Sequence, residues 1–385
     1  MKDYFRSHHN QRLQNAYATW ALNIPVAQII AICLSDPKHA MAAFFGISLI
    51  GRQVCIASPE IIKNLDSRFT SLIEKQKPND DVIIAGKMTN FITFSSGTTC
   101  APKAILRSHK SWIFSFGKTG VKLTDSVAIL GHLSHSLALY AACEAMHIGA
   151  QINYCGMRPC RTPTVIYATP TLLKLVYKNS EIYSQVRLIF IGGGHFSAAD
   201  KSFCDERFPN ADVRIFYGTA ETSFITISDS NTPNGSVGRA FYGVKIQTKN
   251  EVISVETPML AVKYMRSTKI FGDSTPFVTG ELGWVDKNGF LYIHGRSDRA
   301  VKIADKMVHL DVLESELMLI KGVKNAAVIT LPDIKRGQRA FGAVIGNDVK
   351  HPQISNILQL TKWPQLLSGK TDYLKLKEIL AKAFL

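Results

Sequence analysis

A short segment of the chain, residues 94–104, has the residue types of a loop that binds a polyphosphate. Its sequence, FSSGTTCAPKA, combines serine and threonine hydroxyls, a glycine and a lysine after an apolar run. Backbone N–H groups and hydroxyls of such a loop can surround phosphate oxygens, and the lysine adds positive charge. The Walker spacing G-x-x-x-x-G-K-[ST] is absent, and an ordinary polar turn is the alternative interpretation.

A second segment, residues 217–221 (YGTAE), follows another apolar run. Its tyrosine can stack on a base, and its glutamate can hold Mg²⁺ beside phosphates. The alternatives are that Tyr217 is a core residue and that Glu221 is a carboxylate favoured by a helix N-terminus.

Three further segments carry groups that a nucleotide site needs. The glycines at 192–194 would let the backbone approach a flat ligand closely. Residues 279–281 (TGE) put a carboxylate in a turn where it could bind ribose hydroxyls, and residues 368–370 (SGK) put a lysine in a loop. A solvated surface lysine is the alternative for Lys370, but the occurrence of all these segments in one chain favours a nucleotide site.

Strands and helices are expected to alternate around these segments as far as about Asn231. This alternation predicts a mostly parallel sheet with helices on its faces, in which ligands bind beyond the carboxyl ends of the strands. The expected strands include 26–33, 54–57, 126–130, 164–167, 186–191 and 213–217, and the expected helices are 37–49, 108–119, 134–148, 170–178 and 196–208.

The pattern changes after Asn231 to short strands at 238–247, 251–256, 260–264 and 290–294, as in an antiparallel sheet or barrel. After Asp298 the pattern is that of a small α+β module, with a helix at 313–320, strands at 326–331 and 340–345, and a terminal helix. We therefore predict an α/β fold with two domains. Residues 1–297 form a large N-terminal domain of mixed, largely parallel sheets with a barrel-like subdomain at 238–297, and residues 298–385 form a small, mobile α+β domain.

Composition limits the classes of function. The 385 residues are 46% hydrophobic and 19% charged, which favours a folded chain with a large core over disorder. The longest apolar stretches are strand-length, so we expect no membrane span. The net charge of +15 allows an anionic partner, but the sequence contains no nucleic-acid-binding motif, and we expect none to be bound.

Cysteine usage indicates a reducing compartment. Seven cysteines are ordinary for this length, and Cys155 and Cys160 have no second Cys/His pair at a zinc-like spacing. We expect reduced thiols in a cytoplasmic protein, with a metal site or a disulfide at this pair as the alternatives.

The order and wording of these segments resemble the adenylate-forming superfamily, which includes acyl- and aryl-CoA ligases and other AMP-dependent carboxylate ligases. The resemblance runs from about Val26 to the C-terminus, and its motifs are specific as a group. It identifies residues 95–103 as the phosphate loop, 217–221 as the adenine and Mg²⁺ motif, and 279–283 as the ribose-binding turn. It also identifies 295–298 as an interdomain hinge and 368–370 as the catalytic-lysine loop.

The resemblance implies a role for each matching residue. The implied catalytic residues are Lys370, Glu221 (also the Mg²⁺ ligand) and Lys103, and the hinge is Asp298. The implied ATP-binding residues are Ser95, Ser96, Gly97, Thr98, Thr99, Gly193, Gly194, Tyr217, Gly218, Thr219, Ala220, Glu281 and Arg296.

Members of this superfamily join a carboxylic acid to AMP, consume Mg-ATP and release pyrophosphate. The chemistry brings together two anions, so cationic groups must draw them close and stabilise the transition state. The resemblance implies that Lys370 does this, and that the C-terminal domain then rotates about the hinge to open a thioester-forming site. CoA, or the phosphopantetheine arm of an acidic carrier protein that would suit the basic charge, is the expected acceptor.

Four departures from the family pattern bear on activity. The N-terminal region is shortened, and Cys100 stands where a glycine is usual, which implies a strained or altered loop. Glu281 replaces the usual aspartate, with one more methylene. Asp305 replaces a glycine of a loop that lines the pantetheine tunnel, which implies slow or absent thioester formation.

The implied pocket for the acid contains His135, Ser136, Gly192 and His195. Amino-acid-activating members have an aspartate at the position of Ser136, so an α-amino acid is not expected. The stretch 192–197 resembles that of aryl-acid ligases, which favours an aryl acid, with a fatty acid next and a structural histidine as the alternative for His135. The alternative function is a catalytically impaired or regulatory protein of the same fold that binds ATP or an acyl-adenylate.

Overall fold

The computed structural model describes residues 11–73, 90–95, 103–194, 196–268, 270–272, 276–304, 306–334, 337–365 and 371–384. These residues form two compact units. The first contains the described residues up to 245 together with 256–276, and the second contains 246–255 and those from 277 onward. The domain boundary that we predict at Asp298 stays a prediction.

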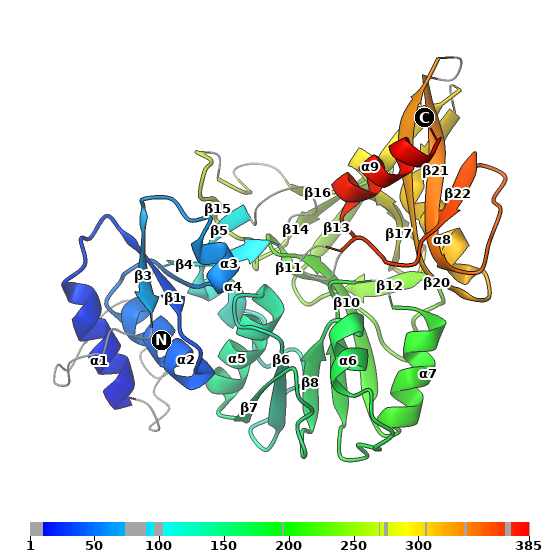
Figure 1. Ribbon diagram of the computed structural model, residues 1–385. Helices are drawn as coiled ribbons and strands as arrows, with labels where there is room; N and C mark the ends of the chain where they lie inside the picture. Colours follow the sequence, from blue (N-terminus) through cyan, green and yellow to red (C-terminus); the bar gives the residue numbers. More distant parts are fainter. Residues whose placement is uncertain are drawn as a thin grey trace. The chain divides into compact units, whose positions relative to one another are not determined.

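The first unit contains a mixed sheet built from the early part of the chain (Figure 1). Its strands follow the order β15 (Lys263–Tyr264), β5 (Lys103–Ser108), β4 (Asn90–Ser95), β2 (Val54–Ile56), β1 (Ile29–Cys33) and β3 (Phe69–Ile73). The last four strands in this order pair in parallel, whereas β4 with β5 and β5 with β15 pair antiparallel. The antiparallel β4–β5 pair is important for the site because the candidate phosphate loop joins these two strands.

A second sheet of the first unit is mostly parallel. Its order is β12 (Ser236–Ala240), β11 (Ser223–Ile227), β10 (Asp212–Thr219), β9 (Leu188–Ile191), β8 (Val165–Ala168), β6 (Ser126–Leu130) and β7 (Gln151–Gly156). Strands β6 to β10 run in parallel, so their carboxyl ends share one edge, while β10, β11 and β12 pair antiparallel.

Five of the seven helices described in the first unit begin at a residue whose side chain caps them. The seven helices are α1 (Gln11–Leu22), α2 (Pro37–Leu49), α3 (Pro59–Ile62), α4 (His109–Ile113), α5 (Ser136–Ile148), α6 (Pro170–Val176) and α7 (Ala198–Arg207). Asp36, Ser58, Ser108 and Thr169 each accept a backbone N–H at the start of a helix, and Ser197 forms a capping box with Asp200.

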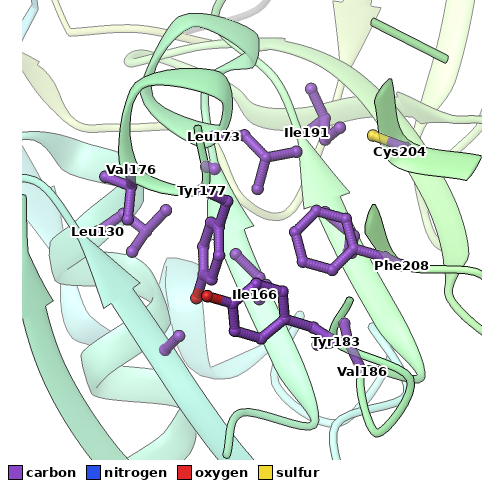
Figure 2. Packing of buried hydrophobic residues seen from close by; sticks show 13 residues of the cluster. Leu130, Ile166, Leu173, Val176, Tyr177, Tyr183, Val186, Ile191, Cys204 and Phe208 are labelled. Carbon is purple, nitrogen blue, oxygen red and sulfur yellow. The ribbon is translucent and has the colours of Figure 1, made fainter. Parts of the chain in front are cut away.

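An apolar core joins α6 and α7 to the parallel sheet. Figure 2 shows Tyr177, Tyr183 and Phe208 in contact in this core, and their rings meet edge-on or tilted at centroid distances of 4.8 to 5.8 Å. Ile166 and Ile191 of the strands complete it. The burial of strand residues on both faces explains why these strands read as continuous apolar runs in the sequence.

The second unit is built from antiparallel strands and a small α+β region. The strands β13 (Lys245–Lys249), β14 (Val252–Glu256), β16 (Phe277–Val285) and β17 (Phe290–Arg296) are neighbours in this order. The rest comprises the 3₁₀ turn η2 (Ser297–Arg299), β18 (Ala300–Ile303), β19 (Lys306–His309), α8 (Leu310–Leu319), β20 (Val323–Asp333), β21 (Gly337–Gly346), β22 (Asn356–Gln359) and α9 (Tyr373–Phe384). Leu313 and Leu317 of α8 pack against Val328 of β20 and Val344 of β21. Leu376 and Leu380 of α9 belong to a separate core cluster.

The predicted α/β class is confirmed, and several predicted element boundaries are wrong. The expected strand at 238–247 is two strands, β12 and β13, separated by a turn. The expected strand at 260–264 is reduced to β15, which pairs with β5 in the first sheet. The expected helix at 108–119 ends at Ile113, and α1 was not predicted.

The expectation of reduced thiols at Cys155 and Cys160 is wrong for this pair. The two residues form a disulfide with a Cα–Cα distance of 5.8 Å, which is the usual separation for such a bond. The short spacing of five residues brings the two sulfurs together as the chain leaves β7. Among the described residues, Cys33, Cys55, Cys143 and Cys204 are free.

Candidate functional site

The ends of the candidate phosphate loop lie opposite each other. Ser95 ends β4 and pairs directly with Lys103, the first residue of β5. The segment therefore joins two adjacent antiparallel strands. Residues 96–102 lie outside the described residues, and with them lie four of the predicted ligands, Ser96, Gly97, Thr98 and Thr99, as well as Cys100.

Two candidate acid-pocket residues lie next to the strand that leads into this loop. His135 forms a bridge with Phe94, the residue before Ser95, and the Ser136 hydroxyl donates a 3.4 Å hydrogen bond to the Phe94 carbonyl. His135 is also the N-cap residue of α5. The structure thus brings together segments that the sequence separates by about forty residues.

A second histidine, His132, lies in the same β6–α5 loop and was not predicted to matter. Its Nδ1 is 2.8 Å from the Ser134 hydroxyl and accepts a hydrogen bond from the Ser134 backbone N–H. Burial, followed by the charge of His135, lowers the pKa of His132. The neutral ring helps to hold the turn from which His135 and Ser136 extend.

The glycine at position 192 is required by packing within the protein, independently of any ligand. A Cβ on Gly192 would lie 2.2 Å from the ring of Phe216, the residue before Tyr217, so Gly192 allows Phe216 to pack on the end of β9. Gly193 has a φ of +75° and Gly194 is exposed. Close approach to a ligand therefore stays a prediction for Gly193 and Gly194, and His195 lies outside the described residues.

The segment 217–221 comprises the end of β10 and the first residues of the turn that leads to β11. The pairing shifts by one residue between Tyr217 and Gly218, and a Cβ on Gly218 would lie only 1.8 Å from the carbonyl oxygen of Ser223. The Thr219 and Thr222 hydroxyls are 3.1 Å apart, and each accepts the other residue's backbone N–H. These contacts place Ala220 and Glu221 at the tip of a tight, internally bonded turn.

Arg107, which the sequence analysis missed, anchors this turn from β5. Its side chain is fully buried, and Nη2 donates hydrogen bonds of 2.6 and 3.0 Å to the carbonyls of Ala220 and Glu221. Nη1 donates to the Met259 carbonyl at 2.6 Å and to the Ser111 hydroxyl at 3.0 Å. Burial lowers the pKa of the Arg107 guanidinium to about 9, so the group stays charged at neutral pH.

The side chain of Glu221 contacts a second residue that was not predicted, Tyr264 of β15. The Tyr264 hydroxyl donates a 2.6 Å hydrogen bond to Oε1 of Glu221. The ammonium of Lys103 lies 5.5 Å from the centre of the same tyrosine ring, within the range of a cation–π contact. Both contacts are invisible in the sequence because more than forty residues separate Tyr264 from Glu221.

The predicted ribose and hinge residues lie together in the second unit. Glu281 of β16 is directly opposite Arg296 of β17, and the Arg296 guanidinium forms a 3.0 Å ion pair with Asp298. The backbone N–H of Arg296 donates to the Asp311 carboxylate at 2.8 Å. Lys370 and Asp305 lie outside the described residues, so their roles stay predictions.

The groups around Glu221 fit a magnesium ion that also binds phosphates. Mg²⁺ is commonly held by one or two carboxylates together with substrate phosphates and waters, rather than by a complete protein cage. Glu221 would supply the carboxylate, and Thr219 has a hydroxyl two residues away. The described residues contain no group of three or more histidine, cysteine or acidic side chains that would form a complete cage.

Comparison with known proteins shows the family to which the chain is related. The family described as "AMP-binding enzyme" matches residues 50–254, more than half of the chain. An uncharacterized acyl-CoA ligase, YhfT, of Bacillus subtilis is 30% identical over 289 residues, which cover 67% of this chain and 59% of YhfT. The 2-succinylbenzoate–CoA ligase of Listeria monocytogenes is 24% identical over 331 residues, which cover 74% and 69% of the two chains.

The chain spans about three fifths of the length of the first curated relatives that it matches. These include a putative long chain fatty acid–CoA ligase, VraA, of Staphylococcus haemolyticus, 26% identical over 72% of this chain and 63% of its own length.

Solved structures share the fold at low sequence identity. ATP-bound MatB from Rhodopseudomonas palustris superposes with a TM-score of 0.83 at 16% identity, covering 98% of this chain and 94% of that one. The o-succinylbenzoate coenzyme A synthetase of Bacillus subtilis, in complex with ATP and magnesium, gives 0.78 at 18% identity, covering 95% and 93%. The arrangement of strands and helices is therefore shared with these two solved structures.

Proposed function

Because the chain belongs to the AMP-binding enzyme family, we propose that it activates a carboxylic acid with Mg-ATP, forming an acyl-adenylate and pyrophosphate. The observation that carries this proposal is the contact chain in the first unit, in which Tyr264 joins Lys103 at the end of the candidate phosphate loop to Glu221. The candidate acid-pocket residues His135 and Ser136 adjoin Phe94 at the other end of that loop. ATP and acid would thus meet at one edge of the two sheets.

The proposed mechanism assigns each side chain an electrostatic task. Lys103, with the hydroxyls of Ser95 and the loop after it, binds the β- and γ-phosphates, and Tyr217 stacks on the adenine. Glu221 would hold a Mg²⁺ ion, which would supply positive charge beside the phosphates. Lys370 draws the carboxylate towards the α-phosphate and stabilises the charge that develops as the acyl–phosphate bond forms and pyrophosphate leaves. Glu281 and Arg296 bind the ribose side of the nucleotide.

The substrate class rests on the acid pocket. Ser136 offers a hydroxyl where an α-ammonium would need a carboxylate, which supports an acid without an α-amino group. An aryl acid is favoured and a fatty acid is next. The names of the relatives include both a 2-succinylbenzoate–CoA ligase and putative long chain fatty acid–CoA ligases.

The acceptor, the domain motion and the location belong to the same proposal. CoA or a phosphopantetheine-bearing acidic carrier protein is the acceptor class, and Asp305 should slow the thioester step. Residues 298–385 would act as a mobile domain that turns at Asp298. We propose a cytoplasmic location and no nucleic-acid partner. The four free cysteines of the described residues support this location, whereas the Cys155–Cys160 disulfide counts against it. None of the helices in the described part of the chain combines the length and apolar character that crossing a membrane requires.

Acid-dependent exchange of labelled pyrophosphate into ATP tests the proposal directly. We expect exchange with at least one acid of a panel of aryl, medium-chain and long-chain acids, and its loss in Lys370→Ala with ATP binding retained. Lys382→Ala, in the last turn of α9, is the matched control and should leave exchange unchanged.

Two results would contradict the proposal. Exchange that persists in Lys370→Ala would show that another residue performs the role of this lysine. A wild-type protein that is stabilised by ATP but exchanges with no acid of the panel would instead support the alternative of a catalytically impaired or regulatory protein.

A further inference from the structure

The hydrogen bond between Tyr264 and Glu221 has the features of a positioning contact. The phenol donates to the carboxylate oxygen Oε1 at 2.6 Å, a short distance typical of a charge-assisted bond. A carboxylate is planar, so a bond that holds Oε1 also restricts where Oε2 lies. The contact therefore limits the orientations that the Glu221 carboxylate can present to a ligand.

Tyr264 is itself firmly held. It pairs with Ile105 of β5, and the backbone N–H of the next residue, Met265, donates to the Ala104 carbonyl at 2.9 Å. Its ring meets the ring of Phe271 edge-on at a centroid distance of 4.9 Å. These contacts fix the phenol relative to β5, the strand that begins with Lys103.

The backbone of Glu221 is held from other directions. Arg107 donates to its carbonyl at 3.0 Å, and the backbone N–H of Ala261 donates to the same oxygen at 2.7 Å. With the main chain anchored in this way, the remaining freedom of Glu221 lies in its side-chain torsions. A bond from Tyr264 to the carboxylate removes much of that freedom before a ligand arrives, and such preorganisation lowers the entropic cost of binding.

Tyr264 also contacts the cation of the candidate phosphate loop. The Lys103 ammonium lies 5.5 Å from the ring centroid, so one side chain contacts both the lysine and the glutamate that are assigned to the phosphates and the metal.

We propose that Tyr264 is a positioning residue that orients the Glu221 carboxylate for a divalent cation bound together with ATP. The inference rests on the proposed nucleotide site and extends it to a residue outside the motifs discussed above. The Tyr264 hydroxyl acts through Glu221, whereas the ring makes a separate cation–π contact with Lys103. Removal of the hydroxyl alone should therefore affect the metal-dependent part of ATP binding and spare the rest.

The experiment measures the dissociation constant of ATP by titration calorimetry, once with Mg²⁺ and once with EDTA. In Tyr264→Phe we expect the gain in affinity due to Mg²⁺ to be about tenfold smaller than in the wild type, as the loss of a hydrogen bond to a charged group predicts. The affinity without metal should stay unchanged because phenylalanine keeps the ring beneath Lys103.

Three controls separate positioning from a general structural effect. Tyr242→Phe removes the hydroxyl of another tyrosine that has a lysine over its ring, Lys118 at 4.8 Å, and should change neither constant. In a Glu221→Gln background, Tyr264→Phe should have no additional effect on the Mg²⁺-dependent gain. Incorporation of 4-aminophenylalanine at position 264 restores a donor at the ring tip and should recover most of the gain.

Other results would overturn the inference. One is a Tyr264→Phe protein with the wild-type gain from Mg²⁺, and another is equal weakening of ATP binding with and without metal. A wild-type protein whose ATP affinity does not respond to Mg²⁺ overturns it as well. Pyrophosphate exchange tests the proposed function separately. A protein that shows the Tyr264-dependent Mg²⁺ effect but no exchange would refute acid activation and leave the role of Tyr264 intact.

Discussion

Arg107 and Glu221 lie 114 positions apart in the sequence, yet Nη2 of Arg107 donates a 3.0 Å hydrogen bond to the Glu221 carbonyl. The arginine is fully buried on β5, just beyond the candidate phosphate loop, and it also bonds to the carbonyl of Ala220. A single side chain thus joins the strand that follows one motif to the turn that contains the other.

Replacement of Arg107 by methionine should destabilise the protein by about 3–5 kcal/mol, because it leaves buried carbonyls without their donor. Chemical denaturation measures the change in the free energy of unfolding. Arg68→Met is the control, since Arg68 is exposed and pairs with Asp66 at the surface, where ion pairs contribute about 0–1 kcal/mol. Equal effects of the two substitutions would contradict the anchoring role of Arg107.

Gly218→Ala should disrupt the turn before Glu221, whereas Gly194→Ala should be tolerated. The added Cβ would lie 1.8 Å from the backbone oxygen of Ser223 in the first case and 3.4 Å from a side-chain atom of Pro170 in the second. We expect a loss of more than about 2 kcal/mol for Gly218→Ala and less than about 1 kcal/mol for Gly194→Ala. Thermal or chemical unfolding distinguishes them, and similar stabilities would show that the turn relaxes around a methyl group.

Glu144→Gln should remove a pH dependence of stability. Glu144 is fully buried and accepts hydrogen bonds from the Thr119 hydroxyl at 2.7 Å, the Gly117 N–H at 3.1 Å and the Tyr167 hydroxyl. Burial raises the pKa of its carboxyl from 4.5 to about 7. The folded state therefore binds more protons than the unfolded state between these values, and stability falls as the pH rises through this window.

The stability of Glu144→Gln relative to the wild type should accordingly increase by on the order of 3 kcal/mol between pH 4.5 and 7.5. Urea unfolding at a series of pH values provides the measurement. Glu206→Gln, on the exposed side of α7, is the matched control because water solvates the carboxylate that it removes. A constant difference between Glu144→Gln and the wild type across this range would contradict the assignment.

The Cys155–Cys160 disulfide predicts the number of reactive thiols. Of the seven cysteines in the sequence, five should react with a thiol reagent after unfolding without reductant, and all seven after reduction. Cys155→Ser leaves six cysteines, and all six should then react without reductant. Seven reactive thiols in wild-type protein that has not been treated with reductant would show that Cys155 and Cys160 are reduced.

Much of the local structure could be predicted because it depends on neighbouring residues. The run from Ser126 to Leu130 is apolar after its first residue and forms the strand β6. Pro37 after Asp36 begins the helix α2, as its cap and proline suggest. The boundaries failed where tertiary packing outweighed local preference. The run at 260–264, for example, contributes only Lys263 and Tyr264 to a sheet, where they pair with β5.

The residues of the candidate site likewise fall into those that local sequence predicts and those that only the tertiary structure reveals. The sequence alone identified which short segments could bind phosphate, metal and acid, because Ser95, Lys103 and Glu221 occur in local motifs whose chemistry depends on residue type and spacing. It could not identify Arg107 or Tyr264, since an arginine and a tyrosine in ordinary strands have no local signature.

Tertiary structure alone decided that these two residues meet Glu221. Packing of the two sheets of the first unit brings β5 and β15 to the turn between β10 and β11. Hydrogen bonds and cation–π contacts act over only a few ångströms, so their partners are set by how distant strands come together. The residues that we propose to supply the chemistry were therefore readable in the sequence, while Arg107 and Tyr264, which contact Glu221, became visible only in the fold.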